Sequence, residues 1–437
     1  MSFIKHTLGL FISNVFVVLA SFVLGILTAR FLEPAGKGQL YLALQIIALS
    51  TVVLSGGFGP TYQFFISSGK EAYNRIIAFA ISQVLTITLL LILGLLSFGL
   101  YFHVFFVEIV DFRLSLLISI GIVLNVVNLF TSSVVLSSSE GITIHSKLIA
   151  IGAIVNLLAV YFMIIAECLT FQTALIANYL GLSSQIIARL FIIFGKGIVL
   201  DFSNLIPLTR KLIMFAAPSF ITNVALILVF KINTFFIVNM LGAESMGVFS
   251  MSIAFAEISL VLPNTVGTVI FTKTPSLKQS EKLDMLLKSN RTIILIAFIS
   301  SLFITFLAPL IVNLLLGIEY AGAVKPLQFL APGLIFMASN YAMTNFFTGN
   351  GRPWLVARIY MISVILNVVL NYVLISKLAL IGASLSAGIT YLAMACMFYF
   401  HLLKNNSVSM KKLLVFTSTD LLLLRTFSRS MIVRDER

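Results

Sequence analysis

Long runs of apolar residues, separated by short polar segments, fill almost the whole chain. Many exceed 18 residues, a length at which an α-helix crosses a hydrocarbon core of about 30 Å. The runs lack the alternation of barrel strands, and a backbone in lipid must satisfy its own polar groups, so they are predicted to be helices. We count twelve spans, at about residues 7–29, 38–66, 76–100, 113–136, 147–166, 173–195, 212–240, 246–271, 292–316, 327–348, 355–375 and 379–402.

The polar segment after the first span recurs in the second half of the chain. Residues 29–41 read Ala-Arg-Phe-Leu-Glu-Pro-Ala-Gly-Lys-Gly-Gln-Leu-Tyr, and residues 240–250 read Met-Leu-Gly-Ala-Glu-Ser-Met-Gly-Val-Phe-Ser. When Leu32 is aligned with Leu241 and Gly38 with Gly247, the two segments are offset by 209 residues. A persistent offset is typical of a duplicated half. Here it stays between 208 and 211 where Leu32 falls on Leu241, Gly38 on Gly247, Leu54 on Leu262, Glu140 on Asn350, Asn156 on Asn367 and Ala174 on Ala383.

The duplication predicts the fold class and the division of the chain. We expect an all-α integral membrane protein with about twelve transmembrane helices in two duplicated six-helix lobes, residues 1–200 and 201–403. A basic cytoplasmic tail, residues 404–437, follows the lobes. Because each lobe has an even number of spans, both lobes are expected to enter the membrane with the same orientation.

Composition and charge support this topology. The chain is 60% hydrophobic and only 10% charged, which excludes an ordinary soluble globular protein. With the N-terminus inside, 21 of the 28 Lys and Arg residues lie on the cytoplasmic side, 5 lie on the opposite side, and Arg189 and Lys231 lie within spans. This asymmetry satisfies the positive-inside rule and predicts that both termini are cytoplasmic. Orientation therefore accounts for the net charge of +13 without a nucleic-acid partner.

The sequence pattern predicts no catalytic site. Connections between the predicted spans do not exceed about 20 residues, which leaves no room for a soluble catalytic domain. The four histidines are scattered near span ends and predict no metal site. The segment 34–38 has the wrong spacing for a phosphate-binding loop, and no strand precedes it. The sequence therefore predicts neither an enzyme nor a cofactor.

Two charged residues lie deep in the apolar spans. A charge at the centre of a transmembrane helix costs roughly 2.5–3.5 kcal/mol on insertion scales, which makes it a functional candidate. Lys231 lies well inside the seventh span and Glu257 near the middle of the eighth, on helices that a short hinge makes antiparallel neighbours. One interpretation is an ion pair between them. The other is that Lys231 faces a wet central cavity and attracts an anion, while Glu257 holds Lys231 or exchanges a proton or cation with it.

Arg189 and a group of amides are further polar candidates. Arg189 lies about one and a half turns from the cytoplasmic end of the sixth span. Its side chain either extends to the membrane surface, as long basic side chains do, or supplies a second cation to the cavity. Most amides inside the spans are expected to hydrogen-bond between helices, while a minority line a polar path suited to sugar hydroxyls. Asn14 and Asn233 are the amides that we place in the candidate cavity.

Glycine and proline interrupt corresponding spans of the two halves. The segment Ser-Gly-Gly-Phe-Gly-Pro, residues 55–60, interrupts the second span, and Pro-Asn at 263–264 interrupts its counterpart, the eighth. Paired interruptions are typical of bending or of a substrate site, but glycine and proline are also common in membrane helices generally, and both interpretations remain open. The residues that we assign to hinges are Arg30, Glu33, Gly38, Gly57, Pro60, Pro218 and Pro263.

These features together resemble a known family of polysaccharide flippases. The resemblance is carried by the hinge at residues 29–41, its echo at 241–247, the lysine of the seventh span, and Gly-Ala-Ser at 382–384, which opens the twelfth span. Over residues 5–402 these features are similar to those of the Wzx-type O-antigen and capsule repeat-unit flippases, which belong to the multidrug, oligosaccharidyl-lipid and polysaccharide (MOP) exporter superfamily.

The resemblance implies a fold and a function. The fold is a MATE-like pair of lobes that open alternately to either side of a bacterial inner membrane. The cargo is an undecaprenyl-pyrophosphate-linked oligosaccharide, a repeat unit of O-antigen, and hence of lipopolysaccharide, or of capsule. It moves from the cytoplasmic to the periplasmic leaflet. Besides the lipid bilayer, the implied partners are a polysaccharide polymerase and chain-length proteins.

Two other functions remain open. A cation-coupled multidrug exporter of the same fold would need carboxylates in the membrane, and Glu257 is the only deep one that the sequence offers. A non-transporting scaffold of a polysaccharide assembly complex would tolerate the loss of every charge in the cavity.

Overall fold

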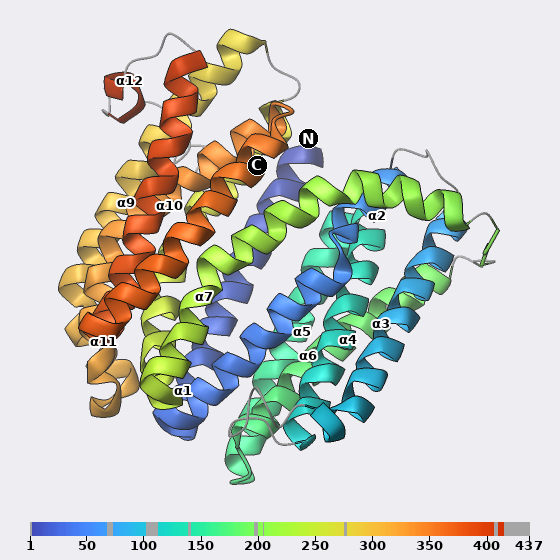
Figure 1. The fold of residues 1–437 in the computed structure, drawn as a ribbon, viewed down its shortest axis with the longest axis horizontal. Helices are drawn as coiled ribbons and strands as arrows, with labels where there is room; N and C mark the ends of the chain where they lie inside the picture. The colour runs from blue at the N-terminus through green and yellow to red at the C-terminus, as the bar shows by residue number, and fades with distance from the viewer. Residues whose placement is uncertain are drawn as a thin grey trace, which may run out of the picture. The chain divides into compact units, whose positions relative to one another are not determined.

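The computed structural model is described over residues 2–67, 73–101, 112–138, 141–195, 200–203, 205–274, 278–405 and 410–414, and within these ranges it contains helices and no strands (Figure 1). The helices are α1 (Ser2–Ser55), α2 (Phe58–Ser67), α3 (Tyr73–Tyr101), α4 (Phe112–Leu136), α5 (Gly141–Ile165), α6 (Phe171–Phe194), α7 (Leu205–Ser259), α8 (Val261–Lys273), α9 (Gln279–Leu316), the 3₁₀ helix η3 (Ile318–Ala323), α10 (Val324–Gly349), α11 (Pro353–Asn405) and α12 (Met410–Leu414).

Nine helices in the described ranges are long and apolar enough to cross a membrane. Three of them fold back at a single non-helical residue: α1 at Glu33, α7 at Gly242 and α11 at Ala379. Each of these three therefore supplies two crossing segments, so the nine helices supply twelve. The predicted all-α membrane fold with about twelve spans is confirmed.

The backbone repeats the duplication that the sequence indicates. Glu33 has φ 57° and ψ 172°, and Gly242, 209 residues later, has φ 87° and ψ 170°. Glu167, between α5 and α6, has φ 52°, and Ala379, 212 residues later, has φ 48°. Positive φ is uncommon outside glycine, so three non-glycine residues adopt a costly conformation at corresponding turns. The two halves therefore share the positions of their tightest turns.

The paired helix breaks also lie at corresponding places. Gly56 and Gly57 separate α1 from α2 with φ values of 60° and 73°, and Leu260 separates α7 from α8. The third residue of the helix that follows is a proline in both cases: Pro60 in α2 and Pro263 in α8. Proline is tolerated in a first helical turn because the backbone N–H groups there have no intrahelical acceptor. The predicted interruptions are thus real breaks.

The chain divides into two compact units, which we describe separately. The first comprises Met1–Met251 and Leu315–Tyr320, and the second comprises Ser252–Leu314 and Ala321–Arg437. The predicted lobe boundary near residue 200 rests on the repeat, and it stays a prediction.

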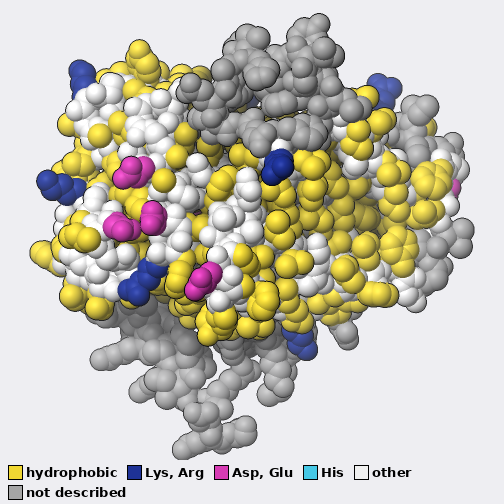
Figure 2. Space-filling model, turned by 90° about the horizontal axis from the view of Figure 1, so that it is seen from below, with side chains coloured by type: hydrophobic (Ala, Val, Ile, Leu, Met, Phe, Trp, Pro, Cys, Tyr) yellow, Lys and Arg dark blue, Asp and Glu magenta, His cyan; other side chains and the backbone are white. Residues whose placement is uncertain are grey.

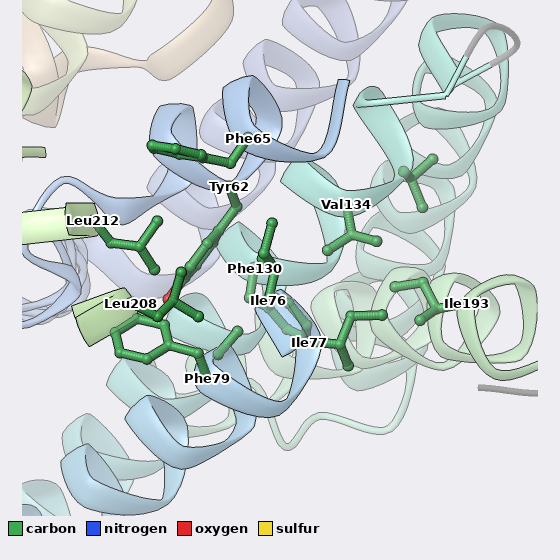
Figure 3. Packing of buried hydrophobic residues seen from close by; sticks show 12 residues of the cluster. Tyr62, Phe65, Ile76, Ile77, Phe79, Phe130, Val134, Ile193, Leu208 and Leu212 are labelled. Atoms are coloured by element: carbon green, nitrogen blue, oxygen red, sulfur yellow. The ribbon is translucent and has the colours of Figure 1, made fainter. Parts of the chain in front are cut away.

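In the first unit, α4, α5 and α6 pack on one another and on α1 (Figure 1). Aromatic and branched side chains of α2, α3, α4, α6 and the beginning of α7 form a core (Figure 3). Tyr62 of α2 lies at its centre, with ring centroids 5.9 Å from Phe130 and 6.3 Å from Phe79. Leu208 and Leu212 bring the beginning of α7 into the same cluster. Burial of these side chains fixes the first turns of α7 against the first six spans.

A polar contact accompanies this packing. Arg75, at the beginning of α3, pairs with Asp201 in the connection to α7 at 3.1 Å. Hydrogen bonds from Ser203, assisted by Arg75, hold the pKa of the Asp201 carboxyl below its ordinary value. The carboxylate is therefore charged at neutral pH and holds the connection beside α3.

In the second unit, α10 packs closely on α11. A Cβ atom added at Gly333 would lie 2.7 Å from the Cα of Gly388, so the two backbones touch where both residues are glycine. Asn340 donates a hydrogen bond to the Tyr391 carbonyl oxygen at 2.9 Å, and Ser384 donates one to the Pro326 carbonyl oxygen at 2.7 Å. Small residues and buried amides hold these helices together, as is typical in membranes.

Part of the predicted tail forms the short helix α12, which docks on the second unit. Leu413 is wholly buried. Asn290 donates to the Leu413 carbonyl oxygen at 3.2 Å, and Arg291 donates to the Lys412 carbonyl oxygen at 2.6 Å. Residues 406–409 and 415–437 of the predicted tail lie outside the described residues.

On the described part of the face drawn in Figure 2, hydrophobic side chains are widespread and charged side chains are scattered. Large apolar side chains such as Phe306, Leu310 and Phe191 are strongly exposed on their helices. A lipid environment explains this exposure, because water would disfavour it over so large an area.

Candidate functional site

Lys231 lies in the first half of α7, eleven residues before the turn at Gly242. At 1.5 Å of rise per residue, this places it roughly 16 Å from the turn, about halfway across a hydrocarbon core. Its side chain is half-buried, and Nζ lies 3.4 Å from the Tyr41 hydroxyl and 5.7 Å from the centroid of the Tyr41 ring. A phenol carries no negative charge, so this contact positions the ammonium without neutralising it.

Glu257 lies fifteen residues after Gly242, in the last turn of α7, where the Leu260 backbone N–H donates to its carbonyl oxygen at 3.1 Å. Its side chain is exposed. The carboxylate thus stands directly before the helix break rather than within an uninterrupted helix. Lys231 belongs to the first compact unit and Glu257 to the second, and an ion pair between them stays a prediction.

Of the two amide candidates, the structure describes the side chain of Asn233 but not that of Asn14. Asn233 is buried, with 4% of its surface exposed, two residues after Lys231 on α7. Asn14 lies in α1, where the backbone is described, but its side chain lies outside the described part of the chain.

Arg189 is enclosed within the first unit and does not extend to its surface. The side chain is wholly buried. Its guanidinium donates to the Asn128 Oδ1 atom and, at 3.1 Å, to the Gln185 Oε1 atom, and it lies 3.5 Å from His145 Nδ1. These partners come from α4, α5 and α6, so the charge lies where three helices meet. Snorkelling to the membrane surface is therefore not what this side chain does.

The first hinge is held by contacts on both of its arms. Glu33 adopts the strained conformation of the turn, and its side chain is exposed. Arg30 Nε donates to the Leu315 carbonyl oxygen at 2.6 Å. Lys37 is buried, and its Nζ donates to the Thr28 hydroxyl at 2.7 Å and to the Gly25 carbonyl oxygen at 3.3 Å. The lysine thereby ties the second arm of the hinge to the first.

The break between α1 and α2 is held against α7. A Cβ atom added at Gly57 would lie 2.8 Å from the Phe220 backbone nitrogen and 3.0 Å from the Ala216 carbonyl oxygen. Pro218 lies between these two residues, in a stretch of α7 that remains helical, and its own side chain is not described. The break and the predicted bend of α7 therefore face each other.

Sequence reasoning misses the groups that partner the charged candidates. Tyr41 is part of the repeated segment, but the pattern assigns it no role, and His145 is one of the scattered histidines. The predicted topology counts Lys37 among the loop charges of the non-cytoplasmic side, whereas the structure buries it. Among the described residues, no three His, Cys, Asp or Glu side chains are grouped closely enough to hold a metal ion.

Comparison with known proteins agrees with this architecture. The sequence profile of the family described as "Polysaccharide biosynthesis protein" matches residues 3–274, and the MatE profile matches residues 218–373. A curated relative, the "Uncharacterized membrane protein MJ1068" of Methanocaldococcus jannaschii, is 29% identical over 94 residues, which are 22% of this chain and 18% of that protein. The chain thus matches less than a fifth of this relative's length.

Solved structures of transporters share the fold. "Lipid II flippase MurJ, inward closed conformation" has a TM-score of 0.75 at 14% identity and covers 98% of this chain and 93% of its own. A "multidrug resistance MATE family transporter of the MOP superfamily" in its inward-facing conformation has a TM-score of 0.70 at 16% identity and covers 90% of this chain and 96% of its own. These similarities confirm the predicted membrane-transporter fold.

The profile of the first family covers more than half of the chain, including the duplicated hinge and Lys231. The chain therefore belongs to the polysaccharide biosynthesis protein family.

Proposed function

We propose that this protein is a flippase that moves an undecaprenyl-pyrophosphate-linked oligosaccharide, an O-antigen or capsule repeat unit, from the cytoplasmic to the periplasmic leaflet of a bacterial inner membrane. The family membership supports a role in polysaccharide biosynthesis, and the fold supports movement of a lipid-linked substrate across the membrane. The sugars of the repeat unit are carried through a polar path, while the prenyl chain stays in lipid.

The observation that carries the proposal is the depth of Lys231. A cation midway across the hydrocarbon core is costly, and a pyrophosphate passing through the membrane needs such a cation at this depth. Lys231 is half-buried, so its ammonium is not sealed within a helix bundle as the guanidinium of Arg189 is. Lys231 is therefore the residue that we assign to the pyrophosphate, and Asn233, two residues away, is a candidate partner for sugar hydroxyls.

Tyr41 prepares Lys231 for this role. The tyrosine lies on the second arm of α1, and its hydroxyl and ring both face the ammonium. A flexible lysine loses rotamer entropy when it binds an anion, and a contact that already restrains it lowers that cost. Tyr41 is thus a positioning residue for the cation.

The test measures flipping in cells that lack the chromosomal gene. Lipid-linked oligosaccharide on the outer leaflet is oxidised by periodate added outside spheroplasts, and material on the inner leaflet is protected. Lys231→Ala is expected to lower the oxidised fraction by roughly ten- to a hundredfold, because a charge-assisted hydrogen bond is lost. Lys231→Arg keeps the charge and is expected to retain most activity. Tyr41→Phe is expected to lower activity by roughly two- to tenfold, because it removes only the hydroxyl.

Lys377→Ala is the matched control, because this lysine is exposed near the turn at Ala379. Its flipping is expected to equal that of the unaltered protein. Normal flipping by Lys231→Ala, at equal amounts of protein in the membrane, contradicts the assigned role of Lys231. An unchanged leaflet distribution after deletion of the gene contradicts the flippase itself.

Export of cationic drugs is the second candidate, since the MatE profile matches residues 218–373. Glu257 lies within this match, exposed at the helix break, where a carboxylate is accessible to a cation. If deletion leaves surface polysaccharide unchanged but raises sensitivity to cationic drugs, this function replaces the first. Glu257→Gln is then expected to reproduce the drug sensitivity.

A further inference from the structure

The two duplicated turns meet each other through their glycines. A Cβ atom added at Gly38 would lie 1.7 Å from the Ala243 carbonyl oxygen and 2.9 Å from the Gly247 backbone nitrogen. A Cβ atom added at Gly247 would lie 1.8 Å from the Pro34 carbonyl oxygen. Main chain therefore rests on main chain, at a separation that only glycine permits. We call the contact of Pro34 and Gly38 with Ala243 and Gly247 the glycine seam.

The glycine seam is reciprocal. Pro34 and Ala243 are 209 residues apart, as are Gly38 and Gly247. The glycine of each turn thus rests on the carbonyl at the equivalent position of the other turn. This is the pattern of a two-fold interface, here between two halves of one chain. In Figure 1 the turns of α1 and α7 lie together at one end of their helices. Because each turn makes the same contact with the other, the two contacts are expected to form and break together.

Buried apolar side chains lie close to the glycine seam in the sequence. Met246 and Ala29 are wholly buried, and Leu32 and Leu40 are buried as well. Lys37, the nearest buried charge in the sequence, directs its ammonium to Thr28 and Gly25 on the other arm of its own hairpin. Backbone contact and apolar packing therefore contribute to holding the seam.

Two hydrogen bonds reinforce the seam from the side. The Tyr320 hydroxyl donates to the Ala29 carbonyl oxygen at 2.9 Å, and Arg30 Nε donates to the Leu315 carbonyl oxygen at 2.6 Å. Both acceptors are backbone carbonyls. These bonds join the first hinge to the segment 315–320, which belongs to the same compact unit. Two hydrogen bonds to backbone carbonyl oxygens are few enough to form and break repeatedly as the contact closes and opens.

We infer that the glycine seam, with its Arg30 and Tyr320 hydrogen bonds, is the gate that closes the non-cytoplasmic end of the transport path and must part to release the transported molecule. The inference rests on the proposed function for the identity of that molecule. The predicted topology places both turns on the non-cytoplasmic side.

The experiment measures the opening of the gate with a thiol reagent. Cys168 and Cys396 are free and exposed, so both are first replaced by serine. Met246→Cys then places a single buried thiol within the second turn. A membrane-impermeant maleimide added outside spheroplasts is expected to label this introduced thiol slowly. Gly38→Ala in this background is expected to raise the labelling rate by about tenfold or more, because the overpacked seam is relieved by parting the turns.

Gly25→Ala is the matched control on the same helix, because a Cβ atom added there meets nothing within 4 Å. It is expected to leave the labelling rate unchanged. Gly247→Ala is expected to match Gly38→Ala, and the double variant is expected to gain little more, because either overlap alone parts the seam. Independent, multiplicative effects of the two glycines would overturn the reciprocal contact.

A second measurement needs no change at either glycine. Cells that carry only Met246→Cys in the cysteine-free background are labelled during synthesis of lipid-linked oligosaccharide, and flipping is then measured with periodate. A bulky adduct on the introduced thiol is expected to stop flipping. Absence of labelling over many turnovers, labelling from the cytoplasmic side alone, or normal flipping by the labelled protein each overturn the gate. The labelling rates are measured without any flipping assay, so failure of the flippase proposal leaves them interpretable.

Discussion

The enclosed guanidinium of Arg189 illustrates, at the scale of single residues, how this chain holds a charge inside the membrane. The described lengths of α4, α5 and α6 contain no Asp or Glu. Arg189 is held instead by the neutral acceptors Asn128, Gln185 and His145. Hydrogen bonds to a charged group contribute roughly 1.5–3 kcal/mol each, so the cluster offsets much of the desolvation cost. Loss of one acceptor leaves a buried N–H group without a partner.

Asn128→Ala is therefore expected to lower the free energy of unfolding by about 1–3 kcal/mol, the cost of an unsatisfied buried donor. Thermal melting in detergent, followed by the loss of monodisperse protein, measures the change. Ser132→Ala is the control on the same helix, because its hydroxyl donates only to the Leu129 carbonyl oxygen of α4. Equal melting temperatures for the two variants contradict a supporting role for Asn128.

The sequence locates these charges but not their partners, for a physical reason. A lysine or arginine within an apolar run is conspicuous at any depth, so Lys231 and Arg189 are found. Tyr41 lies 190 residues from Lys231, and Asn128 lies 61 from Arg189. Contacts over such separations depend on which helix faces meet, and the apolar pattern of a membrane helix does not encode its face as an amphipathic pattern does.

At the scale of elements, the helix break between α1 and α2 combines backbone strain with close packing. Gly56 and Gly57 both have positive φ, but their surroundings differ. A Cβ atom at Gly56 would meet the flexible ring of Phe58 at 3.1 Å, whereas a Cβ atom at Gly57 would meet the backbone of α7 at 2.8 Å. The ring can move aside, and the backbone cannot. The break is therefore fixed in place mainly through Gly57.

This difference predicts an order of stability. Gly56→Ala is expected to cost about 1–2 kcal/mol, the penalty of left-handed backbone for a residue with a Cβ atom. Gly57→Ala is expected to cost about 1–3 kcal/mol more, because it also overpacks the contact with α7. Melting temperatures of the two variants in the same detergent measure the difference. The reverse order would show that the contact of Gly57 with α7 does not restrain the break.

Elements are predictable to the extent that length and apolarity define them. The twelve spans follow from runs longer than 18 residues, and the breaks before Pro60 and Pro263 follow from helix-breaking residues. The turn at Ala379 is not foreseeable as a single residue, because alanine carries no turn signal and the close backbone contacts near the turn lie at other residues. A Cβ atom added at Gly382, for instance, would lie 2.1 Å from the Leu374 carbonyl oxygen. The helix α12 has only five residues and owes its place to the burial of Leu413.

At the scale of the whole molecule, the sequence repeat and the contacts divide the chain differently. The repeat predicts halves that join near residue 200, whereas the first compact unit continues to Met251 and includes Leu315–Tyr320. Three contacts account for the difference: the glycine seam, the burial of Leu208 and Leu212 in the core of the first spans, and the hydrogen bonds of Arg30 and Tyr320. The repeat reflects the duplication of the sequence, whereas the contacts reflect the closed state of the end at which the turns of α1 and α7 meet.

The same contacts predict that the two halves assemble without a covalent link. Fragments 1–200 and 201–437, co-expressed in one cell, are expected to copurify through a tag on either one and to restore flipping. Each fragment carries an even number of predicted spans, so both insert with the native orientation, and the cut falls in a connection between helices, where cuts are best tolerated. Arg75 and Asp201 then form an ion pair between fragments rather than within one chain.

A cut after Gly242 is the control for this experiment. It leaves seven spans in the first fragment, so the second must begin from the opposite side of the membrane, and it removes the connection that holds Ala243 and Gly247 in the seam. This pair is expected neither to copurify nor to restore flipping. Adding Gly38→Ala to the 1–200 fragment is expected to weaken copurification, because its seam no longer closes. If fragments 1–200 and 201–437 insert stably but do not bind each other, the boundary near residue 200 is wrong, and the chain assembles as the compact units divide it.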